Sequence, residues 1–288
     1  MSIHVERPAT VAEFLARAGN YLAAREAEHN LIFALTSTLT TNPEVYPEPP
    51  LFAVAADEAR GPVLAAAMQT PPHNLILAEV ADPRAVAILA DELAGEALPG
   101  VLGPTVAVAE FAARWSAAAG SSTHQAMAER IYRCGRVTPP RPAAGTSRLA
   151  TSADRELIID WLRAFNTEAH VRSPDDAPIV ADRWLGRVGG RTMWLWEVHG
   201  RPVSASGVSG PTPHGIRVGP VYTPPEDRGR GYASNLVAAA TQAQLDAGKA
   251  FVFLFTDLAN STSNHVYQAI GYEAVTDVDM WAFDPAAP

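Results

Sequence analysis

The apolar positions of this chain change repeatedly from the three-to-four-residue spacing of a helix to the spacing of a β-strand. In the first half this pattern predicts a helix over residues 9–28, strands over 51–56, 63–69 and 74–80, a helix over 84–94, a strand over 98–104, a helix over 106–118 and a strand over 128–137. In the second half it predicts a helix containing 157–165, a short helix over 182–187, strands over 191–198, 202–210 and 215–222, a helix over 230–247, a strand over 251–256 and a helix over 260–270. A similar order of elements occurs in both halves. The pattern therefore predicts an α/β fold (α+β, with a mixed sheet) in two similar domains.

The stretch between the two halves has the composition of a linker. Residues 138–147 hold three prolines and a glycine and show no hydrophobic period. Such segments connect domains and do not pack as regular elements. We therefore expect one domain over 1–137, a linker over 138–147 and a second domain over 148–288.

One stretch of the second half has the features of an anion-binding loop. The apolar strand over 215–222 runs into Pro224-Pro225, which cannot donate to a sheet. Gly229 and Gly231 follow. Because glycine has no side chain to cover the backbone, successive N–H groups there can face a ligand. The next helix starts there, and its N-terminus carries about half a positive charge. Together these features predict a phosphate or pyrophosphate site.

Two segments in the second half resemble the signatures of one enzyme family. The run Arg228-x-x-Gly231-x-Ala233 resembles the phosphate-loop signature of the GNAT superfamily of acyl-CoA-dependent N-acetyltransferases. The run Asn260-x-x-x-Asn264-x-x-Tyr267-x-x-Ile-Gly-Tyr resembles the second signature of that family. The two runs stand in the expected order, with the expected helix and strand between them. The resemblance covers residues 148–283.

The resemblance implies that acetyl-CoA lies between two splayed strands, with no metal involved. The backbone of Val221 and Thr223 would then bond the pantetheine arm, and the amides of 229–234 would hold the pyrophosphate. The residues expected to bind acetyl-CoA are Val221, Tyr222, Thr223, Arg228, Gly229, Arg230, Gly231, Tyr232, Ala233, Ser234, Asn260 and Asn264. The two arginines supply charge that neutral amides lack. Asn260 is either a ligand of acetyl-CoA or only a helix cap.

Tyr267 is the expected general acid for the departing thiolate, and the alternative is a tyrosine that packs its ring in the core. The identity of the general base stays open, because the strand over 215–222 contains no carboxylate. Glu168, Glu197, His214 and Asp257 are candidates, and a water relay is a further one.

The first half lacks the features of the phosphate loop. The corresponding stretch over 81–86 contains no glycine and carries Asp82. We therefore expect a degenerate GNAT-like domain without an acyl-CoA site. This domain would either form one wall of the acceptor site or hold a homodimer together.

Composition narrows the classes of partner. The chain has 288 residues, a net charge of −9 and 48% hydrophobic residues, and neither half shows the basic stripe of a nucleic-acid-binding protein. No apolar run is long enough for a membrane span. The single cysteine, Cys134, excludes an internal disulfide and a cysteine-based metal cluster, and no histidine or carboxylate pattern suggests a metal.

The start has no signal-peptide pattern, so we expect a cytoplasmic protein. A single lysine, Lys249, against 21 arginines suggests a GC-rich bacterial genome.

These observations lead to a functional expectation. The protein transfers an acetyl group from acetyl-CoA to a primary amine, preferably of a small molecule, by direct attack in a ternary complex. A protein N-terminus or lysine side chain is the alternative acceptor. The alternative classes are a non-catalytic acyl-CoA sensor or scaffold and a purely structural protein.

Overall fold

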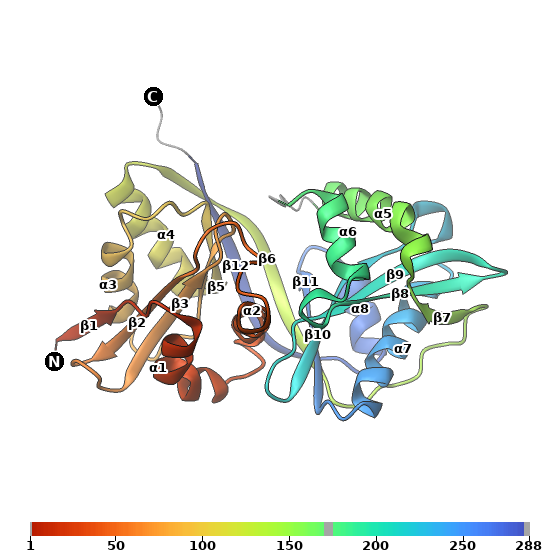
Figure 1. Cartoon of the computed structure of the whole chain (residues 1–288), viewed down its shortest axis with the longest axis horizontal. Coiled ribbons are helices and arrows are strands. Elements are labelled where there is room, and N and C mark those ends of the chain that lie inside the picture. The colour runs from red at the N-terminus through yellow and green to blue at the C-terminus, as the bar shows by residue number, and fades with distance from the viewer. Residues whose placement is uncertain (1, 170–174, 285–288) are drawn as a thin grey trace. The chain divides into compact units, whose positions relative to one another are not determined.

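The computed structural model describes residues 2–169 and 175–284, which form two compact units (Figure 1). Unit 1 comprises the chain up to Ile131 together with Asp257–Ala259 and the segment from Val275 onward. Unit 2 comprises Tyr132–Thr256 and Asn260–Ala274. Within the described ranges, no helix combines the length and the apolar character that crossing a membrane requires.

Unit 1 is built on a mixed sheet. Its elements in chain order are β1 (Ile3–Glu6), α1 (Val11–Ala23), α2 (Asn30–Thr41), β2 (Leu51–Asp57), β3 (Val63–Gln69), β4 (Leu75–Leu77), α3 (Arg84–Glu92), β5 (Gly100–Pro104), α4 (Thr105–Ala119), β6 (Ser122–Cys134, which ends in unit 2) and β12 (Glu273–Asp284). The strands β1 to β4 pair antiparallel in sequence order, and β4 pairs parallel with β5.

Alternate side chains of β2 and β3 face opposite sides of this sheet, so each side carries its own core. Ala53 and Ala55 face α3 and α4, whereas Phe52 and Val54 face α1 and α2. Thr10 caps α1 by accepting the amide of Glu13.

Unit 2 repeats this plan. Its elements are β7 (Thr146–Leu149), α5 (Arg155–Glu168), α6 (Ala177–Leu185), β8 (Thr192–Val198), β9 (Arg201–Ser209), β10 (Gly215–Tyr222), α7 (Tyr232–Asp246), β11 (Phe251–Asp257) and α8 (Ser261–Ala269). The strands β7 to β10 pair antiparallel in sequence order, and β10 pairs parallel with β11.

Helices cover both faces of the unit 2 sheet (Figure 1). Ile158 and Leu162 of α5 share a cluster with Trp184 of α6 and with Met193 and Leu195 of β8. On the other face, α7 and α8 form a cluster with β10 and β11. The predicted order of elements in both halves is therefore confirmed, and β10 and β11 correspond to β4 and β5 of unit 1.

Four elements lie where the sequence analysis placed none, namely β1, α2, β7 and β12. β12 pairs antiparallel with β5, so that Val278 lies opposite Pro104 and Ala282 opposite Gly100. Residues 275–284 therefore pack in unit 1, although we expected one domain over 148–288.

The expected linker packs against unit 2. Asn235 donates to the carbonyl of Arg141 at 3.0 Å, and the indole of Trp196 donates to the carbonyl of Ala144 at 2.8 Å. The last two expected linker residues already belong to β7.

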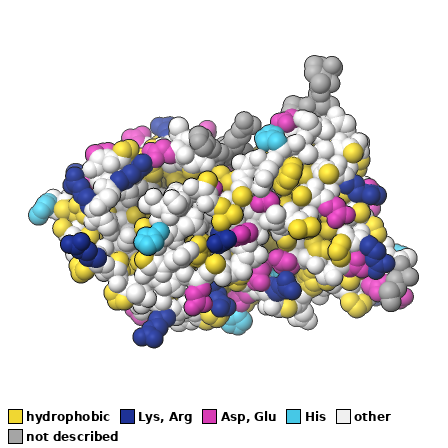
Figure 2. Space-filling view, turned by 180° about the vertical axis from the view of Figure 1, so that it is seen from behind, with side chains coloured by type: hydrophobic (Ala, Val, Ile, Leu, Met, Phe, Trp, Pro, Cys, Tyr) yellow, Lys and Arg dark blue, Asp and Glu magenta, His cyan; other side chains and the backbone are white. Residues whose placement is uncertain are grey.

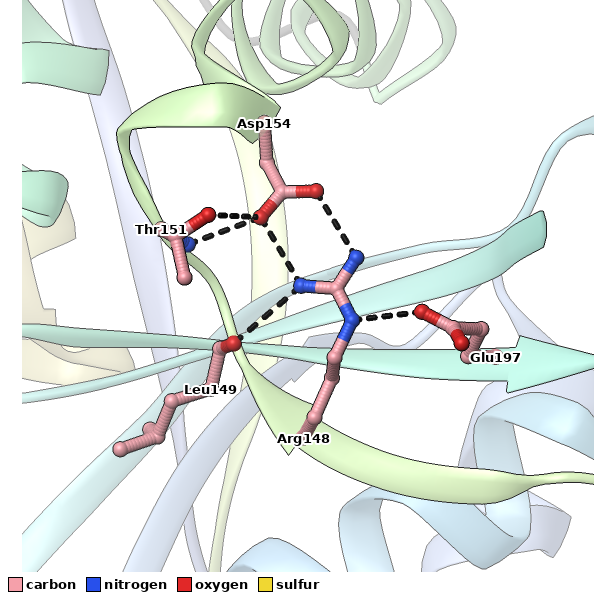
Figure 3. A network of polar contacts seen from close by, with 5 residues as sticks. All are labelled: Arg148, Leu149, Thr151, Asp154 and Glu197. Atoms are coloured by element: carbon pink, nitrogen blue, oxygen red, sulfur yellow. Dashed lines mark hydrogen bonds and ion pairs between the residues drawn. The ribbon is translucent and has the colours of Figure 1, made fainter. Parts of the chain in front are cut away.

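A polar network holds the start of unit 2 together (Figure 3). Arg148 donates to both oxygens of Asp154, at 2.8 and 2.9 Å, and to Glu197 at 2.6 Å. Asp154 also accepts the amide and hydroxyl of Thr151 in a capping box. The hydrogen bonds from Arg148 hold the pKa of Asp154 at about 2.

The surface carries charges of both signs. On the face drawn in Figure 2, Lys and Arg side chains are interspersed with Asp, Glu and hydrophobic ones. This mixture is typical of a surface that does not bind a polyanion through charge alone.

Candidate active site

The sheet of unit 2 opens between β10 and β11. Their parallel pairing covers only Gly215–Arg217 with Phe251–Phe253. Within the described residues, the rest of β10 therefore has no strand partner on the β11 side. The pairing of β10 with β9 also shifts register between Val218 and Val221, as in a β-bulge. A bulge bends its strand, and bulges are frequent next to active sites.

The backbone at the end of β10 is held on its β9 side. Ser204 donates to the carbonyl of Tyr222 at 3.1 Å, and its hydroxyl contacts that of Thr223 at 2.8 Å. Because neighbouring residues of a strand direct their backbone groups to opposite edges, the backbone of Val221 should face the open β11 side. Thr223 follows the end of β10, and its carbonyl accepts a hydrogen bond from Arg228. The orientation of Val221 suits its predicted bond to a peptide-like pantetheine arm.

The loop that follows β10 presents free amides at the head of α7. Gly229 and Gly231 have φ values of 74° and 79°, in the left-handed region that favours glycine. Gly231 caps α7 without a side-chain hydrogen bond. In the part of the chain that the structure describes, the amides of residues 229–234 donate to no carbonyl or side chain. An anion at this helix end would therefore meet unpaired donors.

The equivalent helix end in unit 1 is already satisfied. The amide of Arg84 donates to the Asp82 carboxylate at 2.9 Å, and those of Ala85 and Val86 donate to the carbonyls of Asp82 and Pro83. Asp82 is also ion-paired with Arg84. A second anion would therefore face an occupied helix end and a carboxylate. The absence of an acyl-CoA site in the first half stays a prediction.

A buried carboxylate fixes the loop before its glycines. Asp227 accepts two hydrogen bonds from Arg201, at 2.7 and 2.8 Å, and its side chain is 1% exposed. The hydrogen bonds from Arg201 lower the pKa of Asp227. Arg230 is exposed, and within the described residues it has no ion-pair partner. Its predicted contact with the pyrophosphate stays a prediction.

Arg228 differs from Arg230 because it is already paired. Its guanidinium donates to Glu168 at 2.5 Å and to the carbonyl of Thr223 at 2.8 Å. Tyr222 donates to the other oxygen of Glu168 at 3.2 Å. Burial, followed by the charge of Glu168, raises the pKa of Tyr222. Sequence reasoning missed this cluster, since Glu168 lies far from the loop in the chain.

Tyr267 lies on α8 in the same apolar cluster as Val218 and Val221. Its side chain is buried, with the ring centroid 6.0 Å from that of Tyr272. Burial raises the pKa of Tyr267 to about 12, so the phenol carries its proton at neutral pH. Its hydroxyl has no hydrogen-bond partner in the described part of the chain, whereas that of Tyr272 contacts Thr241 at 2.7 Å. The free hydroxyl is compatible with the predicted acid.

The two asparagines of the second signature serve the helix itself. Asn260 caps α8 by accepting the amide of Ser263 at 3.0 Å. Asn264 donates to the carbonyl of Asn260 and accepts the hydroxyl of Tyr132 at 3.0 Å. The buried Tyr132, which also accepts from Gln268, was not among the expected site residues. Ligand roles for the asparagines stay predictions.

Of the four candidate bases, one lies beside the predicted acetyl-CoA residues. Glu197 belongs to the Arg148 network, and Asp257 accepts the amide of Ala259 in unit 1. His214 immediately precedes β10, at the end opposite Tyr222. Glu168 contacts both Tyr222 and Arg228. Across the ranges described, no group of three or more His, Cys, Asp or Glu residues could hold a metal ion.

Comparison with known proteins supports the same fold. The model of the FR47-like protein family matches residues 212–282, which include β10, the loop, α7, β11 and α8. No curated protein matches the chain.

Several solved structures match over nearly the whole chain. A Drosophila protein from a structural genomics programme aligns with a TM-score of 0.70 at 10% identity, covering 98% of this chain and 99% of its own. A GCN5-related N-acetyltransferase from Sphaerobacter thermophilus has a TM-score of 0.61 at 15% identity and coverages of 99% and 96%. A tandem GNAT protein from the clavulanic acid biosynthesis pathway has a TM-score of 0.56 at 14% identity and coverages of 100% and 99%. The chain is therefore a tandem GNAT-fold protein with an FR47-like segment in its C-terminal half.

Proposed function

We propose that the protein is an N-acetyltransferase that moves the acetyl group of acetyl-CoA to the primary amine of a small molecule, with unit 2 as the catalytic part. The observation that carries this proposal is the set of unpaired amides over residues 229–234. Beside them lie the exposed Arg230 and the open edge of β10. A pyrophosphate and a pantetheine arm need these two kinds of partner.

In the proposed reaction the amine nitrogen attacks the thioester carbonyl carbon. A C–N bond forms, the C–S bond breaks, and the amine loses one proton while the CoA thiolate gains one. Tyr267 supplies the proton to sulfur, because its raised pKa keeps it protonated until that step. A lysine-like amine arrives as an ammonium, and removing its first proton at pH 7 costs roughly 4–5 kcal/mol. The neutral amine loses a second proton on attack. A base or water chain must take both protons, and one of them can return through water to reprotonate Tyr267. Our candidate for this base is Glu168, because it contacts Tyr222 and Arg228 beside the predicted acetyl-CoA residues.

The test combines calorimetry with acetyl-CoA and a thiol-release assay with primary amines. We expect a dissociation constant of about 1 μM to 1 mM, the range in which enzymes commonly have their KM values, and thiol release that depends on the amine. Arg230→Gln should weaken acetyl-CoA binding severalfold. The matched control is Arg84→Gln, at the corresponding helix of unit 1, and it should leave binding unchanged.

Two results would contradict the proposal. Failure to bind acetyl-CoA would refute it altogether. Tight binding without thiol release, for every amine and for peptides with a free N-terminus, would instead favour a sensor of acyl-CoA.

A further inference from the structure

The hydroxyl of Tyr132 holds helix α8 at two points. Tyr132 donates to the side-chain carbonyl of Asn264 at 3.0 Å and accepts the side-chain amide of Gln268 at 2.8 Å. Asn264 and Gln268 are four residues apart, so both lie on one face of the helix. Tyr132 itself lies on β6, beside β11 in the sheet, and its side chain is fully buried. These two hydrogen bonds therefore tie α8 to the sheet of unit 2.

Apolar packing alone constrains the rotation of α8 weakly. The helix has nine residues, Ser261–Ala269, and all of them are described. Tyr267 is the only one whose side chain is buried, and Val266 is partly buried in the same cluster. So short a helix is also marginal without its neighbours. A second restraint, such as the hydrogen bonds of Tyr132, therefore matters more here than in a helix with a broad apolar face.

The rotation of α8 determines where the hydroxyl of Tyr267 lies. Asn264 precedes Tyr267 by three residues and Gln268 follows it by one, so the two contacts flank it in the chain. A side chain that ends about 6 Å from the helix axis moves by about 1 Å when the helix turns by about 10°. A misplacement of about 1 Å in an active site can slow catalysis by about a hundredfold.

We infer that Tyr132 is a positioning residue for Tyr267, because it fixes the rotation of α8 that directs the Tyr267 hydroxyl toward the departing sulfur. This inference rests on the proposed function and names a further residue of the same site. The hydroxyl of Tyr132 is engaged with Asn264 and Gln268, so it acts through the helix and not on the reacting atoms. Tyr132 belongs to unit 2, although the sequence placed it in the domain over 1–137.

A double-mutant cycle with the full chain tests this inference. The experiment measures kcat at saturating acetyl-CoA with a primary amine that the protein acetylates, and acetyl-CoA affinity by calorimetry. Tyr132→Phe keeps the ring and removes the hydroxyl, and it should lower kcat about fivefold, well inside the limit for a misplacement of about 1 Å. Its affinity for acetyl-CoA should stay unchanged. In the Tyr267→Phe protein the same substitution should change kcat by less than about twofold, because no acid is left to misplace.

Tyr272→Phe is the matched control for a lost buried hydroxyl. Tyr272 is buried in the same apolar cluster, but its hydroxyl contacts Thr241 of α7. The control should lower the melting temperature, as Tyr132→Phe does, and leave kcat within about twofold of the parent. If Tyr132→Phe does not fold, Gln268→Met removes one of the two hydrogen bonds from an exposed side chain. That variant should lower kcat about threefold in the parent but not in the Tyr267→Phe protein.

The outcomes separate this inference from the proposed function. A chain that does not bind acetyl-CoA, or acetylates no amine, refutes the proposed function and this inference with it. If the losses of Tyr132→Phe and Tyr267→Phe multiply in the double variant, or if Tyr132→Phe leaves kcat unchanged, only the positioning role is overturned. Weaker acetyl-CoA binding at an unchanged kcat would also overturn that role, because Tyr132 would then orient Asn264 as a ligand.

Discussion

Replacing Gly231 by alanine tests the phosphate loop and the backbone argument together. Gly231 has a φ of 79°, where an L-residue is disfavoured by about 1–2 kcal/mol. A new Cβ would meet Asn235 Nδ2 at 3.6 Å and the Cβ of Ala143 at 3.7 Å, which are ordinary contacts. The cost is therefore conformational. Alanine also restricts the unfolded chain, which offsets roughly 0.4–1 kcal/mol. We expect a net loss of about 1 kcal/mol.

The other end of the same helix offers a matched control. Gly248 follows α7 with a φ of 92°, and a Cβ there would have no neighbour within 4 Å. Gly248→Ala should therefore cost a similar free energy without touching the loop. Each variant should lower the melting temperature by about 2–4 °C. Only Gly231→Ala should also weaken acetyl-CoA binding, by about tenfold, because the strained residue turns the free amides away from the pyrophosphate.

Differential scanning fluorimetry measures the first effect and calorimetry the second. Equal acetyl-CoA affinities in the two variants would show that the head of α7 does not hold the ligand. A Gly231→Ala protein as stable as the parent would show that the loop relaxes out of the left-handed region.

Three further predictions concern the acid, the polar network and the last strand. Tyr267→Phe should turn over at least tenfold more slowly with unchanged acetyl-CoA affinity in calorimetry, and unchanged turnover would exclude the acid role. Arg148 depresses the folded-state pKa of Asp154 to about 2, whereas the unfolded value is near 3.9. The free energy of unfolding that this shift contributes is therefore fully present above about pH 4 and is lost as the pH falls through 2. Asp154→Asn should remove about 2 kcal/mol at pH 7, measured by urea unfolding, and an unaltered acid profile would contradict this. A chain ending at residue 274 lacks the strand opposite β5 and should show rapid amide exchange over Gly100–Pro104, whereas retained protection would show that β12 is dispensable.

The sequence was informative where local chemistry determines the structure. Gly229 and Gly231 predicted the loop because few other residues adopt its backbone conformation. The apolar periods predicted most helices and strands of both halves. The helix α2 escaped notice because its second half is rich in threonine, a poor helix former. The structure shows Thr36 and Thr38 donating their hydroxyls back to carbonyls four residues earlier, which satisfies these groups within the helix.

Contacts between distant segments could not be predicted in this way. The pairing of Arg228 with Glu168 joins two exposed side chains 60 positions apart, and no local pattern identifies such a partner. The short strand β7 was concealed in a proline-rich stretch, since four residues are too few for a period. The hydrophobic pattern of a strand also says nothing about which neighbour it joins, so the position of β12 beside β5 required the structure.

The place of β12 has a consequence for how the protein is made. Gly100–Pro104 leave the ribosome long before their partners Val278–Ala282, which are translated roughly 180 residues later. At about 5–20 residues per second, one edge of β5 stays unpaired for roughly 10–35 s of synthesis. Nascent unit 1 must keep that edge from joining strands of other chains during the interval. Unit 1 therefore acquires this strand only after about 180 further residues have been made, although most of its residues are made first.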